Sequence, residues 1–174
     1  MSKEGRVRAS FAFVIVLSVL VAGAAGPASK HRDIVDHPAC PICGMDRNQY
    51  SHSRMLVDYR EGATGTCSIH CTGADLAVNR HKHINEIYAA DYAGRQLVPA
   101  RTATWVIGGD RTGVMTQRAK WAFGRKEDAE AFVRQHGGKT GTYEDAMKAT
   151  FEDMYQDIKA VRERSKERAK GKVR

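Results

Sequence analysis

Sulfur side chains dominate the part of this sequence that could carry out chemistry. All four cysteines fall in two short motifs, Cys-Pro-Ile-Cys-Gly-Met at residues 40–45 and Cys-Ser-Ile-His-Cys at residues 67–71. Thiolate and thioether sulfurs are the ligands that Cu(I) prefers, whereas a closed set of thiolate and imidazole ligands suits Zn(II). The glycine of the first motif allows a tight turn in which its sulfurs can converge. The two motifs therefore predict a metal site or a redox site.

Further candidate ligands lie inside and outside these motifs. Met115 falls in an expected loop away from any apolar stripe, so core packing does not explain it. His70 is either a ligand or a surface residue. The helix expected to begin near residue 70 would favour thiolates at Cys67 and Cys71, because a helix N-terminus carries a partial positive charge. The full candidate set is Cys43, Met45, Met115, Cys40, Cys67, Cys71, His70 and His37.

Other interpretations of the cysteines remain open from the residues alone. Outside the cytoplasm an even number of cysteines is usually a disulfide framework, and a bridge between the two motifs would stabilise the chain most. A Cys-x-x-Cys redox site normally begins a helix after a strand, which residues 40–43 do not. Neither pair is followed by the histidine of a haem attachment motif. The sequence contains no recognisable catalytic motif, so we expect no enzymatic activity.

The first residues have the pattern of a secretory signal. A short basic region precedes an apolar run at residues 11–21 and small residues at 22–24. The apolar run is about half of the ~20 residues that a membrane-spanning helix needs. We therefore expect a signal segment at residues 1–24, a flexible leader at 25–37 and a periplasmic protein. No cysteine directly follows the apolar run, so we expect no lipid attachment there.

The hydrophobic pattern predicts an α+β fold. At 174 residues, 42% of them hydrophobic, the chain can form one ordinary core or two small ones. A strand-strand-helix-strand (ββαβ) order occurs twice, at residues 38–101 and 102–143, and predicts two similar units in one compact body. In the first unit we expect strands at 55–59, 66–69 and 84–92, a turn at 61–65, a helix at 70–79 and a turn-rich end at 93–101. In the second we expect strands at 103–107, 120–123 and 139–143, a loop at 108–113 and a helix from 127 to 136.

Residues 144–174 predict a long C-terminal helix with a basic tail. Met147, Phe151, Met154, Ile158 and Val161 follow one another in steps of four and three, so we expect this stripe to be packed. The formal net charge of +8 is concentrated at the two ends of the chain, so we do not expect a nucleic-acid partner. The basic tail could make a weak contact with a membrane surface.

Several motifs together resemble those of the NosL family. They are Cys-Gly-Met at 43–45, Thr-Cys-Ser-Ile-His-Cys at 66–71, Trp-Val-Ile-Gly at 105–108 with Gly-Val-Met at 113–115, and the stretch from Ala-Phe-Gly to His-Gly-Gly at 122–138. The resemblance implies a periplasmic copper-binding accessory protein of nitrous-oxide reductase maturation, built from two ββαβ units. It also implies that Cys43, Met45 and Met115 belong to the Cu(I) site. Cys40, Cys67 and Cys71 could enlarge that site, form a separate zinc site or close a disulfide.

The leading hypothesis is a periplasmic metallochaperone that delivers Cu(I) by stepwise ligand exchange. Its partner would be a copper-accepting enzyme such as nitrous-oxide reductase, or the maturation complex of that enzyme. The alternatives are a secreted thiol-disulfide oxidoreductase and a binding module stapled by structural Zn(II) or disulfides.

Overall fold

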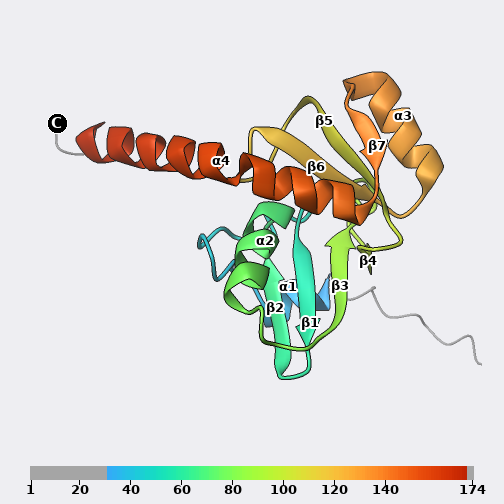
Figure 1. Ribbon diagram of the computed structural model, residues 1–174, viewed down its shortest axis with the longest axis horizontal. Coiled ribbons are helices and arrows are strands. Elements are labelled where there is room, and N and C mark those ends of the chain that lie inside the picture. The colour runs from blue at the N-terminus through green and yellow to red at the C-terminus, as the bar shows by residue number, and fades with distance from the viewer. Residues whose placement is uncertain (1–30, 172–174) are drawn as a thin grey trace, which may run out of the picture. The chain divides into compact units, whose positions relative to one another are not determined.

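The computed structural model describes residues 31–171 of the chain. The secretory segment predicted at residues 1–24 lies outside the described residues, as do residues 25–30 of the predicted leader. Along the chain the elements are α1, β1, β2, α2, β3, β4, β5, β6, α3, β7 and α4 (Figure 1). Of the helices in this described part, none has both the length and the apolar character that crossing a membrane requires.

The first sheet contains the strands of the first predicted unit. They are β1 (Met55–Tyr59), β2 (Gly62–Thr66), β3 (Ile84–Ala90) and β4 (Leu97–Pro99), and α2 (Ile69–Val78) connects β2 to β3. The strands pair antiparallel in the order β2-β1-β3-β4. Along β1, Met55, Val57 and Tyr59 are buried and alternate with less buried residues, so one face of the sheet points into the core.

β2 differs from the sequence prediction. We expected a turn at 61–65 and a strand at 66–69, but Tyr59 pairs with Gly62 across a two-residue turn and the small residues after it form the strand. Glycines are scarce in strands, so two glycines within 61–65 favour a turn in the sequence. Gly65 is required here because a Cβ atom would lie 2.6 Å from the guanidinium carbon of Arg47. The predicted turn-rich end of the unit likewise contains the short strand β4.

The second sheet contains the strands of the second unit. They are β5 (Thr104–Thr112), β6 (Arg118–Phe123) and β7 (Lys139–Gly141), and α3 (Lys126–His136) connects β6 to β7. The strands pair antiparallel in the order β6-β5-β7. We predicted a loop at 108–113, but β5 continues to Thr112 with an irregular register after Ile107. Gly108 and Gly109 have φ angles of 85° and 95°, so glycine lets the strand bulge there and then continue.

The two sheets share one topology, and the predicted ββαβ repeat is confirmed. In each unit the first strand lies between the second strand and the strand that follows the helix. A parallel bridge between Asp91 and Ala122 joins the end of the first unit to β6. The predicted α+β class with a long C-terminal helix is also confirmed.

Two hydrophobic clusters fill the interior. The first core joins the first sheet to β5 and to α4, with Val57, Ile87, Trp105 and Ala146 among its members. The second core combines cysteines of the first unit with aromatic residues of the second. Its members include Cys40, Cys67, Cys71, Trp121, Phe123 and Phe132. The cysteine motifs therefore belong to a packed interior to which both units contribute.

The stripe predicted to be packed on the helix α4 (Tyr143–Gly171) is packed only in part: Met147 lies against the first core. We expected Phe151 and Ile158 to be packed, but both are exposed. The fully buried residues of the helix after its first position are small or polar: Ala146, Ala149, Thr150 and Asp157. Figure 1 shows α4 crossing α2, and a Cβ atom on Gly73 of α2 would lie 3.3 Å from the Thr150 methyl group. The methyl ends of Met154 and Met147 would lie 3.5 Å and 3.7 Å from the same Cβ atom, so these two members of the predicted stripe contact α2 while Phe151 and Ile158 do not lie in the packed face.

Residues 32–36 form the helix α1 (Arg32–Asp36), so the flexible leader predicted at 25–37 is wrong for these residues. The carboxylate of Asp33 lies 2.8 Å from both Arg47 Nη2 and Arg54 Nε, and both arginines are fully buried. Burial alone would raise the pKa of Asp33, but hydrogen bonds and charges from Arg54 and Arg47 hold it below its ordinary value. Pairing these buried charges ties α1 to the domain, a long-range contact that local sequence patterns do not show.

Replacing Asp33 with alanine should destabilise the protein by about 3 kcal/mol, because two buried guanidinium groups lose their carboxylate. The change is measured by urea unfolding of the variant and the wild type. Asp36→Ala is the matched control in the same helix, since its carboxylate is 55% exposed and, among the described residues, pairs with Arg32 alone. Equal stabilities of the two variants would show that the ion pairs do not hold α1 in place.

Candidate metal centre

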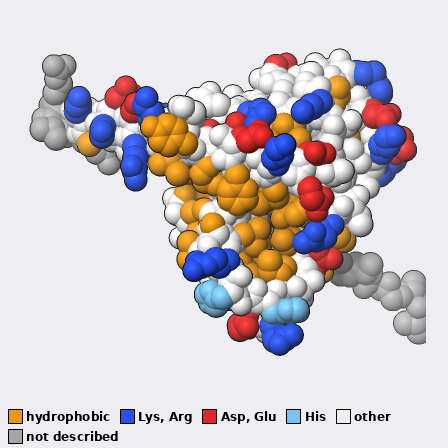
Figure 2. All heavy atoms as spheres, viewed as in Figure 1, with side chains coloured by type: hydrophobic (Ala, Val, Ile, Leu, Met, Phe, Trp, Pro, Cys, Tyr) orange, Lys and Arg blue, Asp and Glu red, His pale blue; other side chains and the backbone are white. Residues whose placement is uncertain are grey.

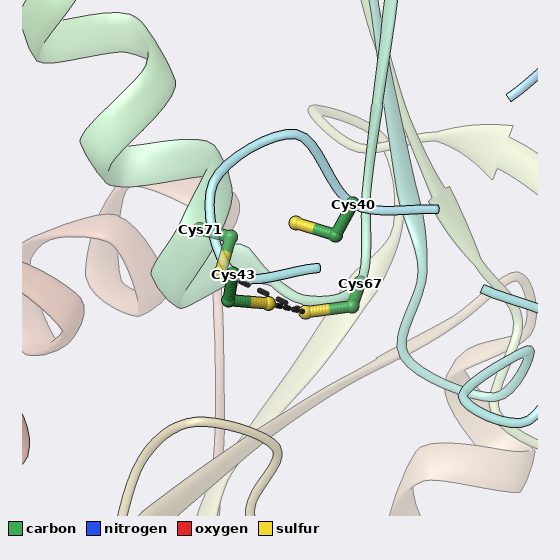
Figure 3. A group of neighbouring side chains, drawn as sticks. All are labelled: Cys40, Cys43, Cys67 and Cys71. Carbon is green, nitrogen blue, oxygen red and sulfur yellow. Dashed lines mark hydrogen bonds between the residues drawn. The ribbon is translucent and has the colours of Figure 1, made fainter. Parts of the chain in front are cut away.

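Four thiol groups converge in the second core. Cys40 and Cys43 come from the turn before β1, Cys67 follows β2, and Cys71 lies in the first turn of α2. Their sulfur atoms all lie within 4.8 Å of one another. The Cys43 and Cys67 sulfurs are 3.4 Å apart, and those of Cys67 and Cys71 are 3.7 Å apart (Figure 3). All four are free thiols, so the structure brings together both cysteine pairs predicted from the sequence.

A tight turn positions the first motif. The N–H of Gly44 donates to the carbonyl of Cys40 at 2.8 Å, and the N–H of Cys40 donates to the carbonyl of Met45 at 2.9 Å. Gly44 has a φ angle of 76°, which glycine adopts without the strain that a side chain would add. The loop closes through these bonds, and Figure 3 shows the Cys40 and Cys43 side chains reaching toward the other two cysteines.

Arg47 fixes this turn against the strand that leads to the second motif. Its Nε donates to the carbonyl of Thr66 at 3.1 Å, immediately before Cys67. The hydroxyl of Ser53 donates to the carbonyl of Cys67 itself at 2.7 Å. These bonds hold the backbone on both sides of the cluster, so the thiols are positioned before any metal ion binds.

The burial of the four thiols is unequal. Cys40, Cys67 and Cys71 are at most 1% exposed, whereas Cys43 is only partly buried. Contacts with the other three thiols lower the pKa of Cys40, and the proximity of Cys40 raises the pKa values of Cys67 and Cys71. Neighbouring thiolates repel each other in a buried site, so they compete for ionisation. A bound cation would remove this conflict and let several thiolates coexist.

Two methionines lie at a cavity beside the cluster. Met45 and Met115 pack against the second core together with Cys43, and both line a cavity of about 440 Å³. The cavity is also lined by Tyr50 and His52 and, from α4, by Asp157 and Arg164. The fold thus brings Met115 of the second unit to the same cavity as Met45 of the first motif.

Residues 31–151 match the family model described as NosL. The chain belongs to the NosL family. This NosL-family chain is similar to the crystal structure of the copper chaperone NosL from Shewanella denitrificans, with a TM-score of 0.50 and 25% identity over 61% of this chain and 87% of that chain. It is also similar to the solution NMR structure of apo-NosL from Achromobacter cycloclastes, with a TM-score of 0.38 and 21% identity over 52% and 82% of the two chains. No curated protein matches it.

Three findings together support copper binding: membership of the NosL family, similarity to the structure of a copper chaperone, and the cluster of four cysteines. Soft sulfur donors select Cu(I) and related soft ions over harder cations such as Mg²⁺ or Ca²⁺. The cluster therefore has the donor chemistry that Cu(I) prefers.

The two candidate histidines lie outside the group of four thiols. The Nδ1 atom of His70 faces α4, 3.3 Å from Oδ2 of the buried Asp157, although their geometry does not make a hydrogen bond. Burial lowers the pKa of His70, which favours the neutral ring. The carbonyl of His37 accepts a hydrogen bond of 2.6 Å from Arg47 Nη1. In this structure the two residues contact α4 and Arg47 respectively, rather than the thiols.

Sequence reasoning missed two residues near the site. His52 lines the cavity, and its ring centroid lies 5.5 Å from that of Trp121. Asp157 accepts a hydrogen bond of 3.1 Å from the N–H of Gln117, two residues after Met115. Nothing in the local sequence of His52 indicates this position. For Asp157 the sequence does contain a signal, because a carboxylate between the apolar residues Met154 and Val161 of the same helix indicates a specific polar contact.

Cys43 should react first with a thiol reagent, because it is the one partly exposed cysteine among the described residues. Mass spectrometry of the reduced, metal-free protein during labelling would follow the four sites. We expect one adduct at Cys43 well before the others, and four adducts at similar rates in denaturant. Labelling of Cys67 or Cys71 as fast as Cys43 would contradict the buried cluster.

Proposed function

We propose that this protein binds Cu(I) in the periplasm and carries it to a copper-accepting enzyme or to the maturation complex of that enzyme. The observation that carries the proposal is the group of four thiol sulfurs within 4.8 Å of one another. They share a core cluster with the two methionines that line the cavity. Membership of the NosL family and the similarity to a copper chaperone support the same function.

The site has a protected part and an accessible part, as a carrier needs. Three of the thiols, Cys40, Cys67 and Cys71, are buried, while Cys43, Met45 and Met115 are partly exposed. Cu(I) is the cargo, and it can leave by ligand exchange. In each step an incoming soft ligand forms a bond to Cu(I) as one sulfur of the chain releases it, without a change of oxidation state. The cavity beside Met45 and Met115 gives the incoming ligand its approach.

The backbone of Met115 supports a role as ligand. Its φ angle of 62° lies in the left-handed region, where a residue with a side chain costs about 1–3 kcal/mol. The surrounding structure maintains this conformation, in part through the bond from Gln117 N–H to Asp157. A role for the Met115 thioether as a metal ligand would explain why the chain keeps this unfavourable backbone conformation. A loop that only connects two strands would not need it.

Zn(II) is a second candidate for the four thiols. A tetrahedral Zn(II) site with Zn–S bonds of about 2.3 Å has sulfur atoms about 3.8 Å apart. The separations of 3.4 Å and 3.7 Å around Cys67 are close to this spacing. A tightly bound zinc ion would give the cluster a role in stabilising the fold, so the binding experiment must measure both Cu(I) and Zn(II).

Removing one sulfur ligand should weaken Cu(I) binding roughly tenfold or more. Cys43→Ser removes the accessible thiolate, and Met115→Leu removes a thioether while it keeps the apolar volume. Affinity is measured by anaerobic competition between the reduced protein and a Cu(I) chelator, with zinc content and free thiols counted in the same samples.

Met147→Leu is the matched control, because Met147 packs partly buried against the first core. It should bind Cu(I) as the wild type does, and unfolding curves should show that all variants are folded. Unchanged affinity in both Cys43→Ser and Met115→Leu would remove the proposed copper site. A protein that retains zinc and does not compete for Cu(I) would instead establish the structural alternative.

The proposed recipient is a cuproenzyme such as nitrous-oxide reductase. Mixing the Cu(I)-loaded protein anaerobically with copper-free enzyme should move copper to the enzyme, and separating the two proteins measures how much. We expect Met45→Leu to change the transfer rate because Met45 lines the cavity by which the incoming ligand approaches. Copper that stays on the loaded protein would argue against this recipient, and copper supplied by the chelator alone is the control.

A further inference from the structure

The helix α4 carries a row of exposed apolar side chains. Phe151, Tyr155 and Ile158 are 50%, 73% and 41% exposed, and their spacing of four and three residues places them on one face of the helix. We call these three residues the α4 stripe. A large aromatic or aliphatic side chain exposed singly needs no explanation, but three aligned on one helix form a surface.

The α4 stripe is part of a wider apolar surface. Figure 2 shows hydrophobic side chains gathered over α2 and the adjoining part of α4, with charged side chains around them. Val78 at the end of α2 is 70% exposed, and Leu76 and Met147 are partly buried against the first core. α2 and α4 pack against each other, so their exposed residues belong to neighbouring elements.

Basic residues continue this face toward the end of α4. Arg162 and Lys166 follow Ile158 in steps of four residues, and both are exposed. Residues 159–171 contain six lysines and arginines against two glutamates, a net charge of +4. Within the described part of the chain, none of these six cations forms an ion pair with a carboxylate. By contrast, Asp153 of α4 forms ion pairs with two cations of β6, Arg118 and Lys120.

We propose that α4 lies along the surface of an anionic lipid bilayer, with the α4 stripe among the headgroups and the basic residues on lipid phosphates. A helix with aromatic and aliphatic residues on one side and long cationic side chains beside them fits a membrane surface, because lysine and arginine extend their charged ends to the phosphates. The unpaired positive charge of residues 159–171 favours anionic lipid.

This orientation keeps the metal site away from the bilayer. Asp157 and Arg164 line the cavity from another side of α4, seven residues apart along the helix. Met45 and Met115 therefore face a cavity that the α4 stripe does not border, and a protein held on the membrane could still present the site to a partner. The proposal does not depend on copper binding.

Vesicle sedimentation tests the proposal. The protein is used as residues 31–174, which contain the compact unit that begins at His31 and exclude the apolar run at 11–21. We expect binding to vesicles of phosphatidylglycerol and phosphatidylcholine in equal parts, and little binding to phosphatidylcholine alone. The triple variant Phe151→Ser, Tyr155→Ser, Ile158→Ser should bind roughly tenfold more weakly, and so should Arg162→Gln with Lys166→Gln. High salt should weaken binding of the wild type.

Matched controls separate this surface from general charge and apolarity. Val35→Ser removes another residue that is 73% exposed, and Lys126→Gln with Lys139→Gln removes two exposed cations far along the chain from the tail. Both controls should bind vesicles as the wild type does, and all variants should bind Cu(I) unchanged. Equal binding of the triple variant and the wild type would overturn the proposal. So would a wild-type dimer that the triple variant makes monomeric while neither binds vesicles, since the stripe would then join two copies.

Discussion

The buried guanidinium group of Arg47 is the constraint on which the site depends. A charge in the interior must find acceptors, and Arg47 finds them in three segments of the chain. It donates to the carboxylate and carbonyl of Asp33, and to the carbonyls of His37, Met55 and Thr66. Because Arg47 follows the first cysteine motif and Thr66 precedes the second, satisfying one charge also sets the distance between the two pairs of thiols.

The proposed carrier function adds a second constraint, because a metal carrier must both shield its metal ion from water and release it to a partner. The buried thiols need a packed and largely dry environment, which the aromatic side chains of the second core supply: the ring centroids of Phe123 and Phe132 are 5.3 Å apart. Met45 and Met115 need access, and they obtain it from a cavity formed where the two units meet α4. The repeated ββαβ topology serves this division, since each unit contributes one side of the site.

The predictions from sequence succeeded for features that depend on residues close together in the chain. Alternating burial along β1 and the short spacing of the cysteines were readable because each depends on neighbouring residues. The predictions failed for features that depend on a contact with a residue far away in the chain. The sequence alone indicates a turn at Gly65. In the structure this glycine is needed because the guanidinium group of Arg47 fills the space where a side chain would lie. Asp33 resembles part of a loose leader until its two arginine partners are known. His52 reaches the cavity only through tertiary packing, so its own neighbours in sequence do not reveal it.

The partly wrong prediction for α4 reflects the two-sided character of that helix. Where α4 approaches Gly73 of α2, small residues such as Thr150 and the flexible ends of Met147 and Met154 form the contact. Phe151, Tyr155 and Ile158 remain exposed, and they are available to another surface. On the packed side, Asp157 binds the N–H of Gln117 near Met115 and lies beside His70, next to Cys71. The helix α4 thus contacts both the loop that carries Met115 and the helix that carries Cys71, so a shift of α4 against α2 would move both sides of the candidate metal site.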